Sequence, residues 1–295
     1  MKTIKADKIY YTVNAAILLL LLLIVAYPLY FIVIASFSDP TLVGSGQVWF
    51  WPRDITLEGY KKILEYEMIW VGYRNTIFYT TIGTTLNVMV TLMCAYSLSR
   101  KDFVGRGIIL ALFTFTMFFG GGLIPTYLLM GDLNLINNPV ILIVLGAVSV
   151  WNLIIARTFF ASTIPDELFE AASIDGCGNG RFFFQMVLPL SKALVAVMAV
   201  YYAVGHWNSY FDAMIYITNR QYMPLQLVLR EILTSQQQLM QQMNDGLVQD
   251  VNENAMIAES IKYGIIIVSS LPMMMIYPFA QKYFVKGVMI GSLKG

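Results

Sequence analysis

Residues 15–35 have the sequence AAILLLLLLIVAYPLYFIVIA, an apolar run that contains no charged side chain. At a rise of about 1.5 Å per residue, a helix of this length spans roughly 30 Å, the thickness of the hydrocarbon core of a bilayer. Three lysines precede the run, at Lys2, Lys5 and Lys8. A cleaved signal peptide has a shorter apolar segment and a small-residue cleavage site. The run therefore predicts a retained first membrane helix.

The composition extends this prediction to the rest of the chain. Hydrophobic residues make up 58% of the 295 residues and charged residues make up 13%, whereas soluble domains carry about 25% charged side chains. Most of the apolar surface must therefore face lipid. The net charge of +1 and the absence of a basic stripe in the sequence exclude a nucleic-acid partner.

Five further apolar segments predict membrane helices. They lie at Asn75–Leu98, Gly107–Met130, Pro139–Phe159, Ala193–Ile217 and Tyr263–Ala280. We expect an all-α polytopic membrane protein with six transmembrane helices. Its expected parts are an N-terminal segment at 1–14, a transmembrane domain at 15–280 and a C-terminal tail at 281–295.

The basic residues predict the orientation of these helices. With the N-terminus inside, 12 of the 19 Lys and Arg residues fall on the cytoplasmic side and 7 outside. Because cytoplasmic loops are enriched in Lys and Arg, both termini are expected in the cytoplasm. Two outer segments are long, about Phe37–Arg74 and Thr218–Lys262. The second is rich in Gln and Asn and is expected to be a partly helical external loop, either a solvated connector or a docking site for a partner.

Residues that could perform catalysis or bind a metal are scarce. Cys94 lies in an apolar run and Cys177 in an expected cytoplasmic loop, so both are expected to be reduced. His206 is the single histidine, and the sequence contains neither a zinc-ligand spacing nor a phosphate-binding Gly-Lys loop. We expect no catalytic residue, no cofactor and no metal, and we expect that this chain does not bind ATP.

The cytoplasmic segment between the fourth and fifth expected spans contains IPDELFEAASIDG, residues 164–176. Pro165 suits a first helical turn, Asp166 and Glu167 complement the positive end of a helix, and Gly176 favours a helix stop. These features predict a short amphipathic helix, which could insert into a groove of a partner or simply join two spans. The residues expected on one face are Leu168, Ala171, Ala172 and Asp175.

Glu170-Ala171-Ala172, followed by Gly176 and by Leu188-Pro189, resembles the EAA loop of the permease subunits of ATP-binding-cassette (ABC) importers. That motif is E-A-A, three residues, G, nine residues and I-x-L-P; this chain has Met186 at the isoleucine position. The resemblance extends over essentially the whole chain. It includes MFFGGGLIPTY at Met117–Tyr127, Trp207-Asn208, and KGVMIGSLKG at Lys286–Gly295. The chain is similar to the maltose-type second permease of the carbohydrate branch, and most similar to the Gram-positive lipoprotein-dependent oligosaccharide permeases.

This resemblance implies a type I ABC importer permease fold in the plasma membrane of a bacterium. It implies a paralogous permease subunit, two ATPase subunits, an extracytoplasmic solute-binding protein and a sugar or oligosaccharide substrate. The segment 164–180 would couple the ATPase to the transmembrane permease domain, and rigid rocking of the helices would give alternating access. The tail at 281–295 could also contact the ATPase. The residues carried over for coupling are Glu170, Ala171, Ala172, Asp175 and Gly176.

Polar and broken positions inside the spans are candidates for the substrate pathway. Gly120, Gly121 and Gly122 with Pro125 are expected to break the third span beside a cavity, or else to allow close helix packing. Asn87 and Asn152 favour hydrogen bonds between helices, and His206 favours a structural role. The fifth span carries a polar and aromatic cluster that either lines the pathway or forms an aromatic belt. The pathway candidates are Tyr201, Trp207, Asn208, Asp212, Gly121 and Gly122, with Tyr201, Asn208 and Asp212 expected along one helical stripe.

Two other classes of protein compete with this interpretation. An ion-coupled secondary transporter or channel usually has ionisable residues inside its spans, and here the spans carry few of them, essentially Asp212 and His206. A membrane-embedded enzyme needs a nucleophile with a base or a metal cluster, and one histidine with two distant cysteines supplies neither.

Overall fold

The computed structural model of the chain describes residues 5–244, 261–276, 278 and 281. These residues form helices and connecting turns, and none of them belongs to a strand. The chain divides into two compact units. Unit 1 comprises Met1–Glu67 and Leu229–Leu271, and unit 2 comprises Met68–Val228 and Pro272–Gly295. The expected transmembrane domain at 15–280 therefore includes parts of both units.

Unit 1 contains α1 (Lys5–Ser36), the short helices α2 (Pro40–Gly44) and α3 (Glu58–Glu65), and most of α14 (Leu225–Asn244) and of helix Ile261–Ile276. The leucines of α1 are exposed along their run, as lipid-facing side chains are. Only the end of α1 packs within the unit, where Ile34 and Ala35 meet Val43 and Val48. The first expected span is thus a helix, and α14 supplies the expected helical part of the loop Thr218–Lys262.

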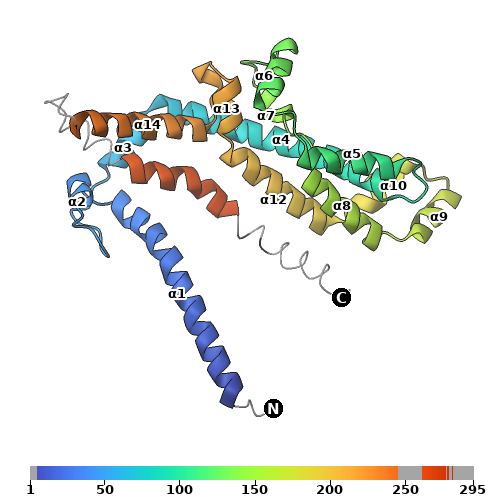
Figure 1. The fold of residues 1–295 in the computed structure, drawn as a ribbon, viewed down its shortest axis with the longest axis horizontal. Helices are drawn as coiled ribbons and strands as arrows, with labels where there is room; N and C mark the ends of the chain where they lie inside the picture. The colour runs from blue at the N-terminus through green and yellow to red at the C-terminus, as the bar shows by residue number, and fades with distance from the viewer. Residues whose placement is uncertain (1–4, 245–260, 277, 279–280, 282–295) are drawn as a thin grey trace. The chain divides into compact units, whose positions relative to one another are not determined.

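Unit 2 is arranged around the 33-residue helix α4 (Glu67–Ser99) (Figure 1). The other elements of unit 2, in chain order, are α5 (Arg106–Phe118), α6 (Leu123–Asp132), α7 (Ile141–Val144), α8 (Val150–Thr163), α9 (Asp166–Ile174), α10 (Asn179–Phe182), the π-helical η1 (Phe183–Val187), α11 (Leu188–Leu190), α12 (Lys192–Asn208), α13 (Phe211–Tyr216) and the 3₁₀ turn η2 (Arg220–Tyr222). The core of this unit joins α4, α8, η1 and α12, with Leu92, Leu153, Val187 and Met198 buried together.

Within the described residues, two helices, α1 and α4, are long and apolar enough to cross a membrane by themselves, and the number rises to four if each of two bent pairs is one span. These pairs are α5 with α6, bent by 115°, and Asn179–Leu190 with α12, bent by 85°. Each of the six apolar segments expected from the sequence corresponds to α1, α4, α5–α6, α7–α8, α12–α13 or helix Ile261–Ile276. Residues 277, 279 and 280 of the last expected segment lie outside the described residues.

The third expected span is broken, as the sequence predicts. Helix α5 ends at Phe118, and α6 begins at Leu123 after the three glycines. Gly122 has a φ of +88°, a left-handed conformation that glycine adopts without steric cost. The side chain of Thr126 donates a hydrogen bond to the carbonyl of Gly122 over 2.8 Å, which closes the first turn of α6.

The prediction of one continuous helix is wrong for two segments, Pro139–Phe159 and Ala193–Ile217. In the first segment, the chain turns at Gly146, which has a φ of +72°, and α8 begins at Val150 after the N-cap residue Ser149. In the second, α12 ends at Asn208 and α13 begins only at Phe211. Backbone turns of this kind carry no clear hydropathy signal, because apolar residues flank them on both sides.

Polar side chains connect α4 to α12 inside unit 2. The Asn87 amide lies 3.3 Å from Nε2 of His206, and the hydroxyls of Thr91 and Tyr202 lie 2.6 Å apart. The Tyr202 hydroxyl also accepts a hydrogen bond from the Ser149 N–H over 3.1 Å. The prediction of an interhelical hydrogen bond at Asn87 is therefore confirmed, and His206 has a structural role in this contact.

Candidate functional site

The predicted amphipathic helix is α9, and its ends have the expected chemistry. Pro165 precedes the helix in an extended conformation, and Asp166 and Glu167 occupy its first turn, where carboxylates favour the positive helix end. Gly176 ends the helix with a φ of +75°. Its N–H donates to the Ser173 carbonyl over 3.0 Å, and the N–H of Cys177 donates to the Ala172 carbonyl over 2.9 Å. This pair of bonds is a Schellman motif, which requires a left-handed residue at the glycine position.

The inner face of α9 packs on the core of unit 2. Ala172 is buried, and Leu168 and Phe169 are half-buried against the same cluster. The Phe169 ring meets the Phe182 ring edge to face, with 5.2 Å between the ring centroids. Edge-to-face contact is a favourable arrangement of aromatic rings, so α9 is seated on unit 2 by apolar contacts rather than being a free loop.

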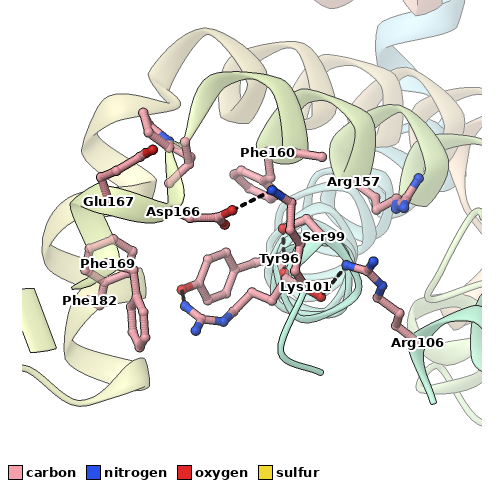
Figure 2. A pocket seen from close by; sticks show the side chains of 14 residues that line it. Tyr96, Ser99, Lys101, Arg106, Arg157, Phe160, Asp166, Glu167, Phe169 and Phe182 are labelled. Carbon is pink, nitrogen blue, oxygen red and sulfur yellow. Dashed lines mark hydrogen bonds and ion pairs between the residues drawn. The ribbon is translucent and has the colours of Figure 1, made fainter. Parts of the chain in front are cut away.

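Two basic residues just beyond the end of α4 also hold α9 against unit 2. Lys101 Nζ lies 2.7 Å from a carboxylate oxygen of Asp166, and the Arg100 guanidinium lies 3.5 Å from the centre of the Phe169 ring (Figure 2). Asp166 raises the pKa of Lys101, and the hydrogen bonds from Arg100 lower the pKa of Asp102. Both effects keep these residues charged at neutral pH, because the lysine stays protonated and the carboxyl stays ionised.

The outer face of α9 is open. Glu170, Ala171 and Ile174 are exposed, and the exposed fraction of Ile174 is 88%. These three residues follow helical spacing at i, i+1 and i+4, so they share one side of the helix. The expected face of Leu168, Ala171, Ala172 and Asp175 is only partly buried: Leu168 and Ala172 pack on the core, while Ala171 and the C-cap residue Asp175 are exposed. The sequence analysis missed Ile174, although an isoleucine between Ser173 and Asp175 on a polar face is itself a signal.

A cavity of about 360 Å³ lies at the end of α4 and is lined by residues from α4, α5, α8, α9 and α10 and from the segments that join them. Its wall combines aromatic side chains with charged ones from α5, α8, α9 and the turn that follows α4 (Figure 2). The charged residues of the lining are Arg100, Lys101, Arg106, Arg157, Asp166 and Glu167. No group of three or more metal-ligating side chains occurs in the described part of the chain.

The predicted pathway residues do not form one helical stripe. Tyr201 and Asn208 lie on α12 and are exposed, but Asp212 belongs to α13, after the break at Ser209 and Tyr210. The Asn208 amide donates to the Val204 carbonyl over 3.0 Å. The expected continuation of the stripe to Asp212 is therefore wrong.

Trp207 and the glycines of the third segment have separate surroundings. Trp207 is 4% exposed, and its ring lies 6.3 Å from that of Tyr73 on α4. Its immediate contacts are thus with this chain. Gly121 and Gly122 are exposed at the break between α5 and α6, and a β-carbon on Gly121 would meet no atom within 4 Å. The break consequently does not serve close packing among the described residues.

Comparison with known proteins places this fold among transport proteins. Residues 78–290 match the family described as binding-protein-dependent transport system inner membrane component. The polygalacturonan/rhamnogalacturonan transport system permease protein YtcP of Bacillus subtilis (strain 168) is 36% identical over 282 residues, which cover 94% of this chain and 96% of the relative. Protein LplC of the same organism is 36% identical over 301 residues, which cover 100% of this chain and 98% of the relative.

A solved structure has the same fold. It comes from a bacterial ABC transporter involved in the import of the acidic polysaccharide alginate. The TM-score is 0.86 at 31% sequence identity, and the alignment covers 96% of this chain and 99% of the solved chain. The described helices therefore form the type I importer permease fold. Because the family match spans more than half of the sequence and both relatives align almost end to end, the chain belongs to the family of binding-protein-dependent transport system inner membrane components.

Proposed function

We propose that this chain forms half of the translocation pathway of an ATP-driven importer for a sugar or oligosaccharide. Support comes from family membership and from relatives whose names refer to the transport of polygalacturonan and rhamnogalacturonan or of alginate. Oligosaccharides of these polymers are therefore the first substrates to test. The comparisons give no support to an ion-coupled transporter or channel.

The observation that carries the coupling proposal is the two-sided construction of α9. One side is fixed to unit 2 by Ala172, Phe169 and the Lys101–Asp166 ion pair, while Glu170, Ala171 and Ile174 face outward. A small helix with an exposed isoleucine and an adjacent alanine suits the groove of a partner. Glu170, Ala171, Ala172, Asp175 and Gly176 are the proposed coupling residues, with Ile174 added as the apolar contact.

The proposed complex contains this chain, a paralogous permease subunit, two ATPase subunits and an extracytoplasmic solute-binding protein. Both termini lie in the cytoplasm in this proposal, so that α9 faces the ATPase. The exposed pathway candidates Tyr201 and Asn208 and the half-buried Asp212, with Gly121 and Gly122, would contact the sugar together with residues of the paralogous subunit. Trp207, which is buried against Tyr73, would hold α12 in place without contacting the sugar.

The coupling proposal is tested by changing the end of α9 in the assembled transporter. Gly176→Asp introduces a side chain at a positive φ and a charge beside the proposed contact. An unpaired charge at an interface costs about 2–5 kcal/mol, so we expect sugar-stimulated ATP hydrolysis and uptake to fall about tenfold or more. The amount of inserted protein and the co-purified permease partner are measured on the same membranes and should be unchanged.

Two matched variants separate charge, strain and contact. Gly178→Asp adds the same carboxylate two residues later, where φ is −74° and a β-carbon meets no atom within 4 Å, and it should transport normally. Ile174→Asp leaves the backbone of α9 unstrained and should reduce ATPase co-purification. Normal transport by both Gly176→Asp and Ile174→Asp, with the ATPase bound, would remove α9 from the coupling role.

A further inference from the structure

The cavity beside α9 carries more positive charge than its own carboxylates neutralise. Four cationic side chains line it against two anionic ones, Asp166 and Glu167. Lys101 is paired with Asp166 over 2.7 Å, and Arg100 binds both oxygens of Asp102 over 2.8 and 2.7 Å. These pairs account for two of the four cations.

Arg106 and Arg157 are the other two, and within the described residues neither has a carboxylate within 4 Å. Each guanidinium instead donates to a main-chain carbonyl at the end of α4. Arg106 donates to Arg100 over 2.8 Å, and Arg157 donates to Leu98 over 3.4 Å. Both side chains are half-buried. Figure 2 shows Arg106 and Arg157 on one side of the end of α4, with Asp166 and Glu167 on the other.

A guanidinium has five N–H donors in a planar fork, so one carbonyl contact leaves most of the donors of each arginine to be satisfied by another group. The fork matches the oxygens of a phosphate better than it matches a single carbonyl. A cavity of about 360 Å³ has the volume of a site for a small polar group. The arrangement therefore suits an anion with several oxygens.

The surroundings of the cavity indicate the source of that anion. The turn between Arg100 and Arg106 exposes Phe103 and Val104, and the first turn of α5 exposes Ile108. Exposed apolar side chains next to two arginines at the end of an apolar helix are typical of the membrane interface, where acyl chains lie beside headgroups. A free inorganic anion has no apolar part that could contact Phe103, Val104 and Ile108.

We propose that the cavity binds the phosphate group of an anionic phospholipid, with Arg106 and Arg157 as its ligands and Phe103, Val104 and Ile108 beside its acyl chains. Since Lys101 and Arg100 belong both to the cavity and to the contacts of α9, the bound lipid lies against the segment that holds the coupling helix. This site goes beyond sugar transport and needs neither sugar nor ATP.

The test uses the full-length chain purified with the subunits that assemble with it. Complexes are exchanged into nanodiscs containing phosphatidylglycerol or only phosphatidylcholine, and retained lipid is measured by native mass spectrometry. Arg106→Gln with Arg157→Gln should reduce phosphatidylglycerol retention about tenfold. Arg181→Gln removes one charge outside the cavity, where Arg181 contacts Gln185, and should retain the lipid.

A second variant guards against loss of folding, because Arg106 and Arg157 also cap α4. Ala161→Glu keeps both arginines and places a carboxylate in the cavity lining, so it should also expel the lipid. If the double variant and Ala161→Glu both retain as much phosphatidylglycerol as the unmodified complex, the proposal is overturned. Displacement of the lipid by millimolar inorganic phosphate alone would overturn the lipid as the source of the phosphate group. Subunit composition, read from the same spectra, separates these outcomes from a failure of the transporter to assemble.

Discussion

Glycine at position 83 allows the imidazole ring of His206 to lie directly against the backbone of α4. A β-carbon built on Gly83 would overlap three atoms of that ring. The same imidazole meets the Asn87 amide one turn further along α4. This one position therefore sets how closely α4 and α12 approach each other in unit 2.

Gly83→Ala should destabilise the protein by about 1–3 kcal/mol, because overpacking forces the ring or the helices to move. The measurement is the melting temperature of the purified protein in detergent. Gly205→Ala is the matched control, since a β-carbon there meets no atom within 4 Å, and its melting temperature should be unchanged or higher.

Replacing the ring should relieve the overlap. In a double-mutant cycle, Gly83→Ala combined with His206→Ala should cost less than the sum of the single changes. Additive costs would show that the two residues do not press on each other.

Residues whose role depends on local backbone geometry could be predicted from the sequence. The helix stop at Gly176 and the charged first turn of α9 follow from rules that involve a few neighbouring residues. The burial of Trp207 against Tyr73 and the exposure of Ile174 could not, because each depends on which side of a helix meets elements distant in sequence.

At the scale of elements, helices that end inside apolar sequence determine the shape of the candidate pathway. The break before Gly122 was predictable because three consecutive glycines precede Pro125. The break between α12 and α13 was not, since Ser209 and Tyr210 are ordinary helix residues by propensity. A helix continuous across that break would put Asp212 on the stripe of Tyr201 and Asn208, and the break makes that prediction wrong.

The surroundings of α12 predict different effects for adjacent residues. Asn208→Ala should raise the sugar concentration for half-maximal uptake about tenfold, because a substrate hydroxyl left unpaired costs roughly 1–3 kcal/mol. Trp207 is buried, so Trp207→Ala should instead lower stability by about 3–5 kcal/mol and reduce the amount of inserted protein. Uptake is measured against sugar concentration and normalised to membrane protein.

Tyr201→Ala extends this comparison to a residue two turns earlier on the same side of α12. If its ring stacks on the sugar, the half-maximal concentration rises while the protein level stays constant. If uptake depends on sugar concentration in the same way in Tyr201→Ala, Asn208→Ala and the unmodified protein, these residues do not contact the sugar, and their roles are in helix packing or at the membrane interface.

At the scale of the whole molecule, hydropathy and charge gave the fold class because both are averages over long segments. All six apolar segments correspond to helical parts of the structure, and the expected ABC importer family is confirmed. The tail at Lys286–Gly295, part of the resemblance to the maltose-type permeases, lies outside the described residues. The division into two units had no counterpart in the sequence, since contacts between distant segments create it.

The orientation remains a prediction that labelling can test. Single cysteines are placed at Gln241 on α14 and at Ser292, after Cys94 and Cys177 have been replaced. Because Lys and Arg favour the cytoplasmic side, an impermeant thiol reagent added to intact cells should label the cysteine at 241 and spare the one at 292. Permeabilised cells should label both, and labelling of both in intact cells would contradict the assignment.

Helix α4 has a mechanical consequence for unit 2. It runs without a proline from Asn75, whose amide donates to the carbonyls of Gln221 and Met223 over 2.7 and 3.0 Å, to Ser99, just before the residues that grip α9. These ends are about 36 Å apart at the helical rise. If α9 moves, α4 can therefore carry that motion as a stiff rod, and we expect the segment around Gln221 to be displaced while the side chains along α4 keep their partners.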